Sequence, residues 1–352
     1  CNINEVIIFS PFDEKCSDKR EENVFPSWQY PFNNGQDFNN LLSLISSLHI
    51  TSLVIQFNFG FFEFENFSYF INKLYEKRVN IIIFLHSTTH PINNKDKELK
   101  NLMKSFKLCS RILVHTISDL NRLKDIGLVD NVSLFPHGIV DIRETCTSNS
   151  SLLSLRNTNK KIKIASYGFC LPNKGFDELI RAIHVLNKSK YIVNLNIFSA
   201  IYNEDNNKYY YQLLELIQTL GLEKRVNMDK DYLPIDYIHK ELSTHDLIVF
   251  PYQHSTESSS ASVRDGIASL KPVLVTPLPI FEDVSDLVNY LPGIAFNEIA
   301  DGVIDWIDHR ENNTETFLNE RSKRNELIEA RCFSNLSIRI FSMIKSLEIN
   351  YF

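Results

Sequence analysis

Short runs of β-branched and other apolar residues alternate with longer helical patterns, and this alternation constrains the fold more than any other feature of the sequence. In the first half the order is strand 5–9, helix 41–48, strand 53–57, helix 67–77, strand 80–85, helix 97–109 and strand 111–114. In the second half it is strand 163–167, helix 176–186, strand 195–198, helix 209–220, strand 247–250, helix 258–269 and strand 273–276. Unbroken apolar strands separated by helices are typical of parallel sheets covered on both faces. The sequence therefore predicts an α/β protein.

A polar stretch without apolar periodicity separates the two halves, between residues 141 and 160. The chain has 352 residues, which is long for a single core, so two domains are expected. We predict two doubly wound, Rossmann-like domains at 1–145 and 161–330, joined by a linker at 146–160. In residues 331–352, the apolar spacing predicts a C-terminal helix that packs back on the first domain; its apolar residues are Leu336, Ile340, Met343 and Leu347.

Composition and charge argue against several classes of protein. The net charge of −6 gives no indication of nucleic acid as a partner. The six cysteines include no CxxC pair, so we expect free thiols in a reducing compartment and no structural zinc. The longest apolar run, at 81–85, is far shorter than the roughly 18 residues that span a membrane, and we see no signal peptide. We therefore expect a cytoplasmic protein and, because the chain starts with Cys1, a piece of a longer polypeptide.

The first segment with a chemical signature follows the strand at 163–167. Residues Gly168 to Gly175 form a glycine-containing turn that leads into a helix and includes Lys174. Such a turn directs backbone N–H groups and the helix dipole at a ligand, and Lys174 adds a positive charge, so a diphosphate would fit. The alternative is a simple left-handed turn before a helix, with Lys174 as a solvated cap.

The second segment, residues 250–266, follows a very apolar strand and carries two carboxylates. Glu257 is expected at the start of a helix, with Asp265 about two turns along the same helical face. Each carboxylate can accept two hydrogen bonds from neighbouring hydroxyls of a sugar or ribose. Arg264 can pair with phosphate in forked geometry, and the small residues 258–262 let a ligand approach the backbone. The alternative is an acidic first helical turn with a surface pair between Arg264 and Asp265.

Three further segments follow strands. The proline turn at 272–283 would either wall a base or sugar pocket or only stiffen a loop. Residues 56–60 and 85–89 each follow a strand of the first half, which predicts Asn58, Gly60 and His86 on the acceptor side of a cleft between the domains. A lone histidine after a buried strand is more often structural than functional, so both roles stay open for His86.

Taken together, these segments resemble the family-4 retaining glycosyltransferases of the GT-B fold, from about Val54 to the C-terminus. The family pattern Gly-Arg-Leu-x-x-x-Lys-Gly is similar to Gly168–Gly175, and the motif of two glutamates with seven intervening residues is similar to Glu257–Asp265. The segments 114–118, 136–138 and 271–273 also match the family. Residues 250–284 most resemble bacterial enzymes that build O-antigen, capsule or S-layer glycans.

The resemblance implies metal-independent transfer, without a cofactor, of a hexose or deoxyhexose from a nucleoside diphosphate sugar. We expect mannose or rhamnose, and a growing surface polysaccharide or lipid-linked glycan as the acceptor. Catalytic roles are implied for His86, Glu257, Lys174 and Arg264. Asp265 would bind the ribose, Glu257 would orient the transferred sugar, and His86 would contact that sugar or the acceptor. The donor-binding residues that it implies are Gly168, Phe169, Lys174, Gly175, His254, Ser258, Ser259, Ser260, Arg264 and Asp265.

The chain departs from the family pattern at three places. Phe169 stands where the family usually has arginine, and Asp265 is one methylene shorter than the usual glutamate. No glycine precedes Gly35, so the glycine turn of the first domain is missing, and we expect its first strand and helix upstream of Cys1. These departures leave two alternatives open: a non-catalytic GT-B module of a larger glycan synthase, and a GT-B sugar-nucleotide epimerase or hydrolase.

A basic stripe is predicted on the helix at 97–109 and just beyond it. Its members recur at alternating three- and four-residue spacing: Lys97, Lys100, Lys104, Lys107 and Arg111. Such an amphipathic helix would dock on an anionic membrane, at the inner face of the cytoplasmic membrane, where a lipid-linked acceptor would lie. The alternative is a solvated lysine face over a stripe packed in the core.

Overall fold

The computed structural model describes residues 6–11, 23–28, 35–91, 94–143, 161–201, 207–312 and 314–349. The predicted linker at 146–160 lies outside these residues. The chain forms two compact units: the first comprises residues 1–137, 256–259 and 336–352, and the second comprises 138–255 and 260–335. Each unit is an α/β structure with a parallel sheet, as the alternation of strand and helix patterns predicts.

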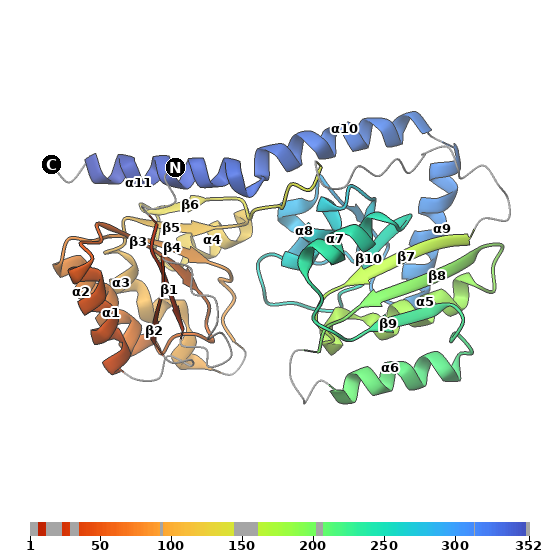
Figure 1. Cartoon of the computed structure of the whole chain (residues 1–352), viewed down its shortest axis with the longest axis horizontal. Coiled ribbons are helices and arrows are strands. Elements are labelled where there is room, and N and C mark those ends of the chain that lie inside the picture. The colour runs from red at the N-terminus through yellow and green to blue at the C-terminus, as the bar shows by residue number, and fades with distance from the viewer. Residues whose placement is uncertain are drawn as a thin grey trace. The chain divides into compact units, whose positions relative to one another are not determined.

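The first unit contains a four-stranded parallel sheet in the order β3-β4-β5-β6 (Figure 1). The strands are β3 (Ser52–Phe57), β4 (Asn80–Leu85), β5 (Arg111–Val114) and β6 (Val132–Leu134). Two further strands, β1 (Ile8–Pro11) and β2 (Val24–Trp28), form a separate parallel pair. The turn that follows β1 lies outside the described residues.

Both faces of the four-stranded sheet are covered. The helices of the first unit are α1 (Gly35–Ser47), α2 (Phe64–Glu76), α3 (Met103–Phe106), α4 (Ile117–Asp125) and most of α11 (Phe333–Ile349). On one face, α1, α2, α3 and α4 bury a core with the side chains of Ile55, Ile83 and Ile112. On the other face, Leu336 of α11 packs with Ile82, which points the opposite way from its strand neighbours because side chains alternate along a strand. The apolar stripe of α11 therefore covers the first sheet.

The prediction of a single helix at 97–109 is wrong. The segment is three short pieces, η2 (Lys95–Lys97), η3 (Leu99–Leu102) and α3, and Glu98 between the first two is extended, with ψ of 128°. Lys97 does not face solvent: its ammonium donates to the Phe62 carbonyl and pairs with Glu63 at 3.0 Å. Burial of Leu99 and Leu102 in the first core competes with a regular helix here.

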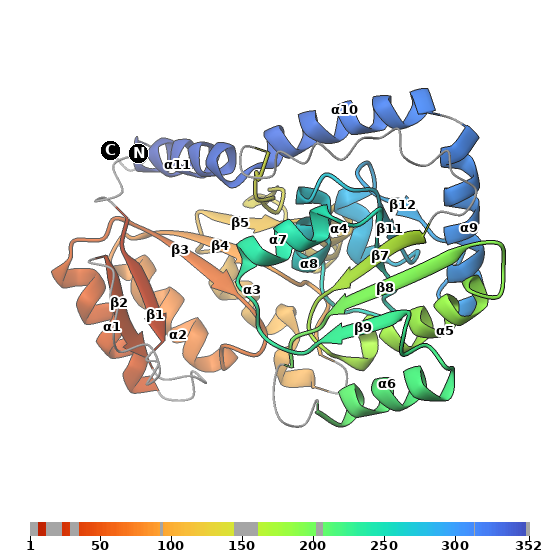
Figure 2. The ribbon, with the colours of Figure 1, turned by 45° about the vertical axis from the view of Figure 1, so that its right-hand side comes forward.

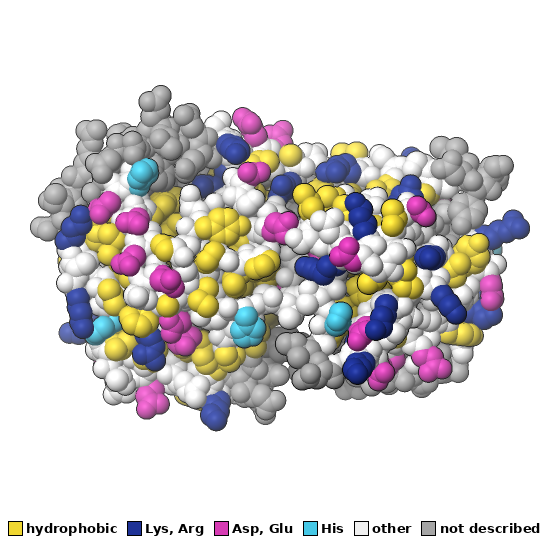
Figure 3. All heavy atoms as spheres, turned by 180° about the vertical axis from the view of Figure 1, so that it is seen from behind, with side chains coloured by type: hydrophobic (Ala, Val, Ile, Leu, Met, Phe, Trp, Pro, Cys, Tyr) yellow, Lys and Arg dark blue, Asp and Glu magenta, His cyan; other side chains and the backbone are white. Residues whose placement is uncertain are grey.

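The basic stripe is lost with that helix. Lys97 is mostly covered, Lys100 pairs with Glu98, and Arg111 lies in β5, whereas Lys104 and Lys107 are exposed. On the face drawn in Figure 3, Lys and Arg side chains are interspersed with Asp and Glu. Contact with an anionic membrane stays a prediction, without the continuous helix on which it was based. In the part of the chain that the structure describes, we find no helix with the length and apolarity needed to cross a membrane.

The second unit contains a six-stranded parallel sheet in the order β9-β8-β7-β10-β11-β12; Figure 1 labels β7 to β10, and Figure 2 labels β11 and β12. The strands are β7 (Lys161–Tyr167), β8 (Ile192–Phe198), β9 (Val226–Asp229), β10 (Leu247–Phe250), β11 (Val273–Val275) and β12 (Asn289–Tyr290). The first strand, β7, lies in the middle, and the strand order reverses between β7 and β10. In open sheets of this kind, ligands bind at the carboxyl ends of the strands at this switch point.

Two cores lie on opposite faces of the six-stranded sheet. The helices of this unit are η5 (Pro172–Lys174), α5 (Phe176–Leu186), α6 (Asn207–Thr219), α7 (Ile235–Ser243), α8 (Ala261–Ala268), η7 (Pro279–Val284), α9 (Phe296–Asn312) and α10 (Thr314–Arg331). The core under α5, α6 and α9 takes Leu247 and Val249 of β10, and the core under α7, α8 and η7 takes Ile248 and Phe250. This alternation explains why β10 is apolar at every position.

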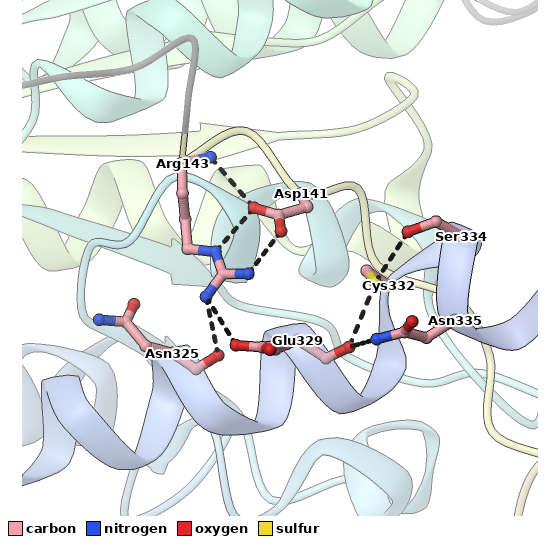
Figure 4. A network of polar contacts seen from close by, with 7 residues as sticks. All are labelled: Asp141, Arg143, Asn325, Glu329, Cys332, Ser334 and Asn335. Atoms are coloured by element: carbon pink, nitrogen blue, oxygen red, sulfur yellow. Dashed lines mark hydrogen bonds and ion pairs between the residues drawn. The ribbon is translucent and has the colours of Figure 1, made fainter.

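The start and the end of the second unit lie side by side (Figure 4). Ile139 forms a parallel bridge with Cys332, and Arg143 binds Asp141 through two nitrogens, at 2.6 and 2.8 Å, and reaches Glu329 of α10. Two further contacts close the network, from Asn335 to the Glu329 carbonyl and between Cys332 and Ser334. The first and last residues of this unit are therefore joined to one another. The thiols of Cys109, Cys170 and Cys332 are buried.

Candidate functional site

A glycine turn at the carboxyl end of β7 forms the centre of the candidate site. Gly168 has φ of +145° and Gly175 has φ of +71°, which L side chains rarely adopt. A Cβ at Gly175 would lie 2.0 Å from the Pro251 carbonyl oxygen. Gly175 is also the N-cap of α5 and has no side chain, so no cap side chain competes with a ligand for the first N–H groups of that helix. The predicted turn therefore forms and presents a helix N-terminus.

Lys174 lies within this turn and is almost covered, with 9% of its surface exposed. Its ammonium lies 3.9 Å from the centre of the Tyr252 ring. The structure gives this ammonium no carboxylate partner among the described residues. A covered cation is costly unless an anion or a π face compensates it. The Tyr252 ring supplies a π face, and a bound anion would add a negative charge that no described carboxylate provides. The low exposure of Lys174 contradicts the alternative of a solvated cap.

The loop after β10 is joined to the glycine turn, because β10 and β7 are neighbours in the sheet. The Gln253 N–H donates to the Asn173 carbonyl at 2.9 Å, and the Asn173 side chain donates to the His254 carbonyl at 3.4 Å. Tyr252 is buried, and its hydroxyl lies 3.0 Å from Ser260 Oγ. The turn after β7 and the loop after β10 thus form one structure at the switch point.

Asp265 of α8 belongs to the same edge of the sheet. His239 of α7 donates from Nε2 to Asp265 Oδ1 at 2.8 Å, and its other ring nitrogen is buried without a hydrogen-bond partner. His239 is 1% exposed, whereas the Asp265 side chain is 17% exposed. His239 therefore orients the Asp265 carboxylate from its buried side, while part of the carboxylate stays exposed to solvent. The sequence patterns identified neither α7 nor His239, because His239 lies in a short helix with no motif around it.

Arg264 does not serve this edge, which corrects the sequence prediction. Successive helical side chains diverge by about 100°, so Arg264 and Asp265 point in different directions. The Arg264 guanidinium is 3% exposed, donates to the Ser260 carbonyl and forms an ion pair with Asp283 of η7. Burial lowers the pKa of Arg264, and the Asp283 carboxylate opposes that shift. A diphosphate cannot reach this guanidinium without breaking a buried ion pair, and no surface pair with Asp265 exists.

The predicted helical pairing of Glu257 with Asp265 is also wrong. Helix α8 begins at Ala261, and Ser260 is its N-cap, accepting from the Val263 N–H. Glu257 lies in the bend before the helix and is exposed, so the two carboxylates do not share a helical face. A serine hydroxyl satisfies the helix start better than the longer glutamate, which moves the boundary three residues along the chain.

The serines of this bend are not all available to a ligand. Ser258 belongs to the first unit, where its hydroxyl donates to Asp119 at 2.7 Å, and the Ser260 hydroxyl caps α8. Ser259 is half-buried, and the His254 side chain is exposed. Of the predicted donor-binding serines, Ser258 and Ser260 therefore serve the protein itself, which corrects their predicted contacts with the donor through the hydroxyls.

Aromatic side chains surround the same strand ends of the second unit. Tyr167 ends β7 and is half-buried, and burial together with the nearby Asp265 carboxylate raises its pKa to about 12. Phe169 is 39% exposed, and its ring stacks on that of Tyr232 with centroids 6.5 Å apart. Tyr232, in the loop after β9, is 82% exposed. Where the family pattern has a second cation, this chain therefore places an aromatic pair.

The predicted acceptor-side residues of the first unit are largely occupied by their own surroundings. Asn58 Oδ1 accepts from the Gly60 N–H at 2.9 Å, which makes a local turn after β3. His86 Nε2 lies 2.7 Å from Gln56 Oε1, and its Nδ1 lies 3.3 Å from His115 Nε2. Burial lowers the pKa of His86 below its ordinary value. With both ring nitrogens in hydrogen bonds, His86 lacks the open nitrogen that a sugar contact requires.

Among the described residues, no group of three or more His, Cys, Asp or Glu side chains is arranged to hold a metal ion. Three histidines of the first unit, His86, His115 and His137, form a packed cluster with ring centroids 5.1 to 6.2 Å apart. The groups that could bind a ligand lie at the switch-point edge of the second unit. They are the covered cation Lys174, the oriented carboxylate Asp265, the N-terminus of α5 and the exposed aromatic rings.

Comparisons with known proteins support the fold and leave the family open. No protein-family model matches the sequence, and no curated protein matches it. Among solved structures, HepE of Anabaena in complex with UDP is similar, with 16% identity, a TM-score of 0.69, and coverage of 92% of this chain and 85% of that chain. A glycosyltransferase from Rickettsia africae has 12% identity, a TM-score of 0.69, and coverage of 92% and 84%. Sucrose-phosphate synthase from Thermosynechococcus elongatus has 11% identity, a TM-score of 0.67, and coverage of 94% and 85%. The chain has the GT-B fold, which confirms the predicted fold class.

Proposed function

We propose that this protein is a nucleotide-sugar-dependent glycosyltransferase whose donor binds at the switch point of the second unit. The observation that carries this proposal is Lys174, a covered ammonium without a carboxylate partner beside the uncapped N-terminus of α5. A diphosphate supplies the missing negative charge. Similar folds bind such donors: HepE is solved with UDP and with UDP-glucose at 16% identity to this chain.

The donor's parts match the groups at this edge. We assign the diphosphate to Gly168–Gly175, with Lys174 as its cation. Asp265, oriented by His239, is assigned to the two ribose hydroxyls, because a carboxylate accepts two such hydrogen bonds. Glu257 keeps its assignment to the transferred sugar on the basis of the family resemblance, since its side chain is exposed. Arg264 and the ring nitrogens of His86 have no role in the proposal.

In the proposed reaction, the bond between the anomeric carbon and the diphosphate oxygen breaks. A bond forms from that carbon to an acceptor hydroxyl, the hydroxyl proton is released, and the nucleoside diphosphate leaves. Charge grows on the departing diphosphate, so groups that stabilise it there lower the barrier. Lys174 and the N–H groups at the start of α5 act in this way.

The finer parts of the proposal come from the family resemblance. They are retention at the anomeric carbon, a hexose or deoxyhexose such as mannose or rhamnose, a surface polysaccharide or lipid-linked glycan as the acceptor, and no requirement for a metal. The first measurement is a thermal-shift screen of the purified chain against UDP, GDP, dTDP and their sugars. A ligand that binds the folded state raises the apparent melting temperature by mass action. A screen without any shift would contradict the proposal.

A variant at Lys174 tests the site itself. Lys174→Met keeps the length and apolar stem of the side chain and removes the charge. We expect transfer to fall by about 100-fold, the typical cost of removing one group that stabilises developing charge. Lys188→Met, an exposed lysine after the far end of α5, is the matched control and should leave the rate unchanged.

Two outcomes would replace the proposed function. Transfer that persists in Lys174→Met would show that the donor site lies elsewhere. Release of the nucleoside diphosphate at the same rate with and without acceptor would favour a sugar-nucleotide hydrolase or epimerase. Tight donor binding without any turnover would favour a non-catalytic module.

A further inference from the structure

Phe169 and Tyr232 place two aromatic rings together at the carboxyl edge of the second sheet. The strand register explains why they meet. Tyr167 pairs with Phe198, and Phe198 pairs with Asp229, so β7 and β9 end at the same level on either side of β8. Phe169 follows β7 by two residues, and Tyr232 follows β9 by three. The loops after these strands therefore converge over the end of β8.

The contact leaves most of one ring open. The two rings are nearly parallel, at 21°, with centroids 6.5 Å apart. That separation is near the outer end of the range for interacting ring pairs, which is about 7 Å. Tyr232 is 82% exposed and Phe169 is 39% exposed. A single exposed aromatic residue needs no explanation, but two aligned rings at a ligand-binding edge provide a preformed stacking surface.

Packing at Gly168 brings this surface to the helix that carries the proposed ribose site. A Cβ at Gly168, the residue before Phe169, would lie 3.2 Å from Ser262 Oγ in the first turn of α8, the helix of Asp265. Burial, and with it the Asp265 carboxylate, raises the pKa of Tyr167, two residues before Phe169, which agrees with this placement. In a nucleotide the base is bonded to the ribose, and the ribose separates the base from the diphosphate. With the ribose on Asp265 and the diphosphate on Lys174, the group next to Asp265 and away from Lys174 is the base.

We propose that the Phe169–Tyr232 pair is a base-stacking platform for the donor, an assignment that rests on the proposed function. The occupant is the planar base of a nucleoside diphosphate, which stacks on the exposed face of Tyr232 beside Phe169. Every base has a π face, so the platform supplies affinity without selecting one base by hydrogen bonds. The platform also compensates for the second diphosphate cation that the family pattern has at position 169.

The test compares ligands that differ in the base. The full chain, its single alanine variants at Phe169 and Tyr232 and the double alanine variant are titrated calorimetrically with UDP, GDP, dTDP and UDP-glucose. Inorganic pyrophosphate is titrated in competition against the nucleotide that binds. We expect Tyr232→Ala and Phe169→Ala each to weaken nucleotide binding by about tenfold, within the range for base–aromatic stacking. Pyrophosphate affinity should stay unchanged, because it carries no base.

Two further variants separate stacking from loss of structure. Tyr232→Trp keeps a stacking surface and should bind nucleotides at least as well as the wild type. Tyr211→Ala removes another exposed tyrosine, 61% exposed on α6, and should have no effect. Melting temperatures of all variants should match the wild type, since the rings that are removed lie largely in solvent.

The outcomes separate this inference from the proposed function. If the wild type binds none of the three nucleotides, the proposed function fails and the platform fails with it. If the wild type binds a nucleotide and the double alanine variant binds it equally well, only the platform is wrong. An equal loss of affinity for pyrophosphate and for the nucleotide in the alanine variants would also show that the platform is wrong. A loss confined to UDP-glucose, with UDP unchanged, would show that the rings contact the sugar and not the base.

Discussion

The two units place polar residues at the same position, the carboxyl ends of parallel strands, and use them differently. In the second unit, Lys174 has an aromatic neighbour and no ion pair among the described residues, and Asp265 has one histidine behind it. In the first unit, the Asp119 carboxylate is fully buried and accepts from three hydroxyls; these are Thr88, Thr116 and Ser258. His86 likewise uses both ring nitrogens.

The difference shows that position at a strand end does not by itself make a binding group. The second unit differs in three ways: Lys174 is covered and has no carboxylate partner among the described residues, α5 starts without a side-chain cap, and the Asp265 carboxylate stays partly exposed. In the first unit the same demands are met by neighbours within the unit; at the start of α4, for example, the Thr116 hydroxyl accepts from the Asp119 N–H. Its strand ends are therefore stabilised by internal hydrogen bonds and offer less to a ligand.

The largest effect is expected on stability, at the buried ion pair of Arg264 and Asp283 in the second unit. Arg264→Ala leaves the Asp283 carboxylate buried without its partner, and we expect it to lower the free energy of unfolding by about 3–5 kcal/mol. The double replacement Arg264→Met with Asp283→Leu removes both charges and should cost much less. Chemical denaturation of the three proteins measures this. If Arg264→Ala instead lost much nucleotide affinity while its free energy of unfolding stayed unchanged, Arg264 would be a donor-binding residue.

The second prediction concerns the corresponding carboxylate of the first unit. Asp119→Ala removes the acceptor for three hydroxyls, and we expect a loss of about 3 kcal/mol in the free energy of unfolding. Asp119→Asn keeps one carbonyl acceptor and should lose less. Neither change should alter nucleotide affinity, measured by calorimetry at a temperature where both variants are folded. Weaker nucleotide binding without loss of stability would contradict the structural role.

A smaller effect is expected for His239, which orients Asp265. His239→Ala frees the carboxylate side chain, so we expect the preference for UDP over 2′-deoxy-UDP to fall by about fivefold, the cost of ordering one side chain on binding. His239→Gln offers an amide donor near the position of Nε2 and should restore most of the preference. If His239→Ala changes the affinity for both nucleotides equally, His239 has only a structural role.

The smallest effect follows from the buried histidines, His86 in the first unit and His245 in the second. Burial lowers the pKa of each below its ordinary value of 6.5. The unfolded chain therefore binds more protons than the folded one, and stability is lost as pH falls below about 6.5. We expect His86→Gln to reduce the difference in unfolding midpoint between pH 7.5 and 5.5. An unchanged or larger difference would contradict the assignment.

Much of the architecture was predictable because periodicity is local. The predicted strands 80–85, 111–114 and 247–250 and the helix 176–186 match β4, β5, β10 and α5 residue for residue. The glycine turn was equally accessible, since a strand, two glycines and a helix pattern are read within fifteen residues. The strands β6, β9 and β12 escaped prediction because they are two to four residues long and carry too little pattern to stand out; the longer helices α4, α7 and α9 were missed as well.

Two of the errors have a different cause, which is competition from partners distant in the sequence. Arg264 was assigned to a ligand, yet Asp283 is the group that its guanidinium meets. The helix expected at 97–109 breaks where Lys97 turns to Glu63 and the Phe62 carbonyl. Spacing along a helix shows which residues share a face, but it cannot show whether a charged side chain finds its partner inside the protein.

The sequence by itself determined the two α/β halves, the glycine turn and the candidate carboxylate, because each depends on neighbours within a few residues. Only the tertiary structure decided which charges remain open. It placed β7 beside β10, joined the turn at Gly168–Gly175 to the loop at 251–254, buried Arg264 against Asp283 and set His239 behind Asp265. These outcomes depend on contacts between residues far apart in the chain, where burial and hydrogen bonding determine whether a polar group serves the fold or a ligand.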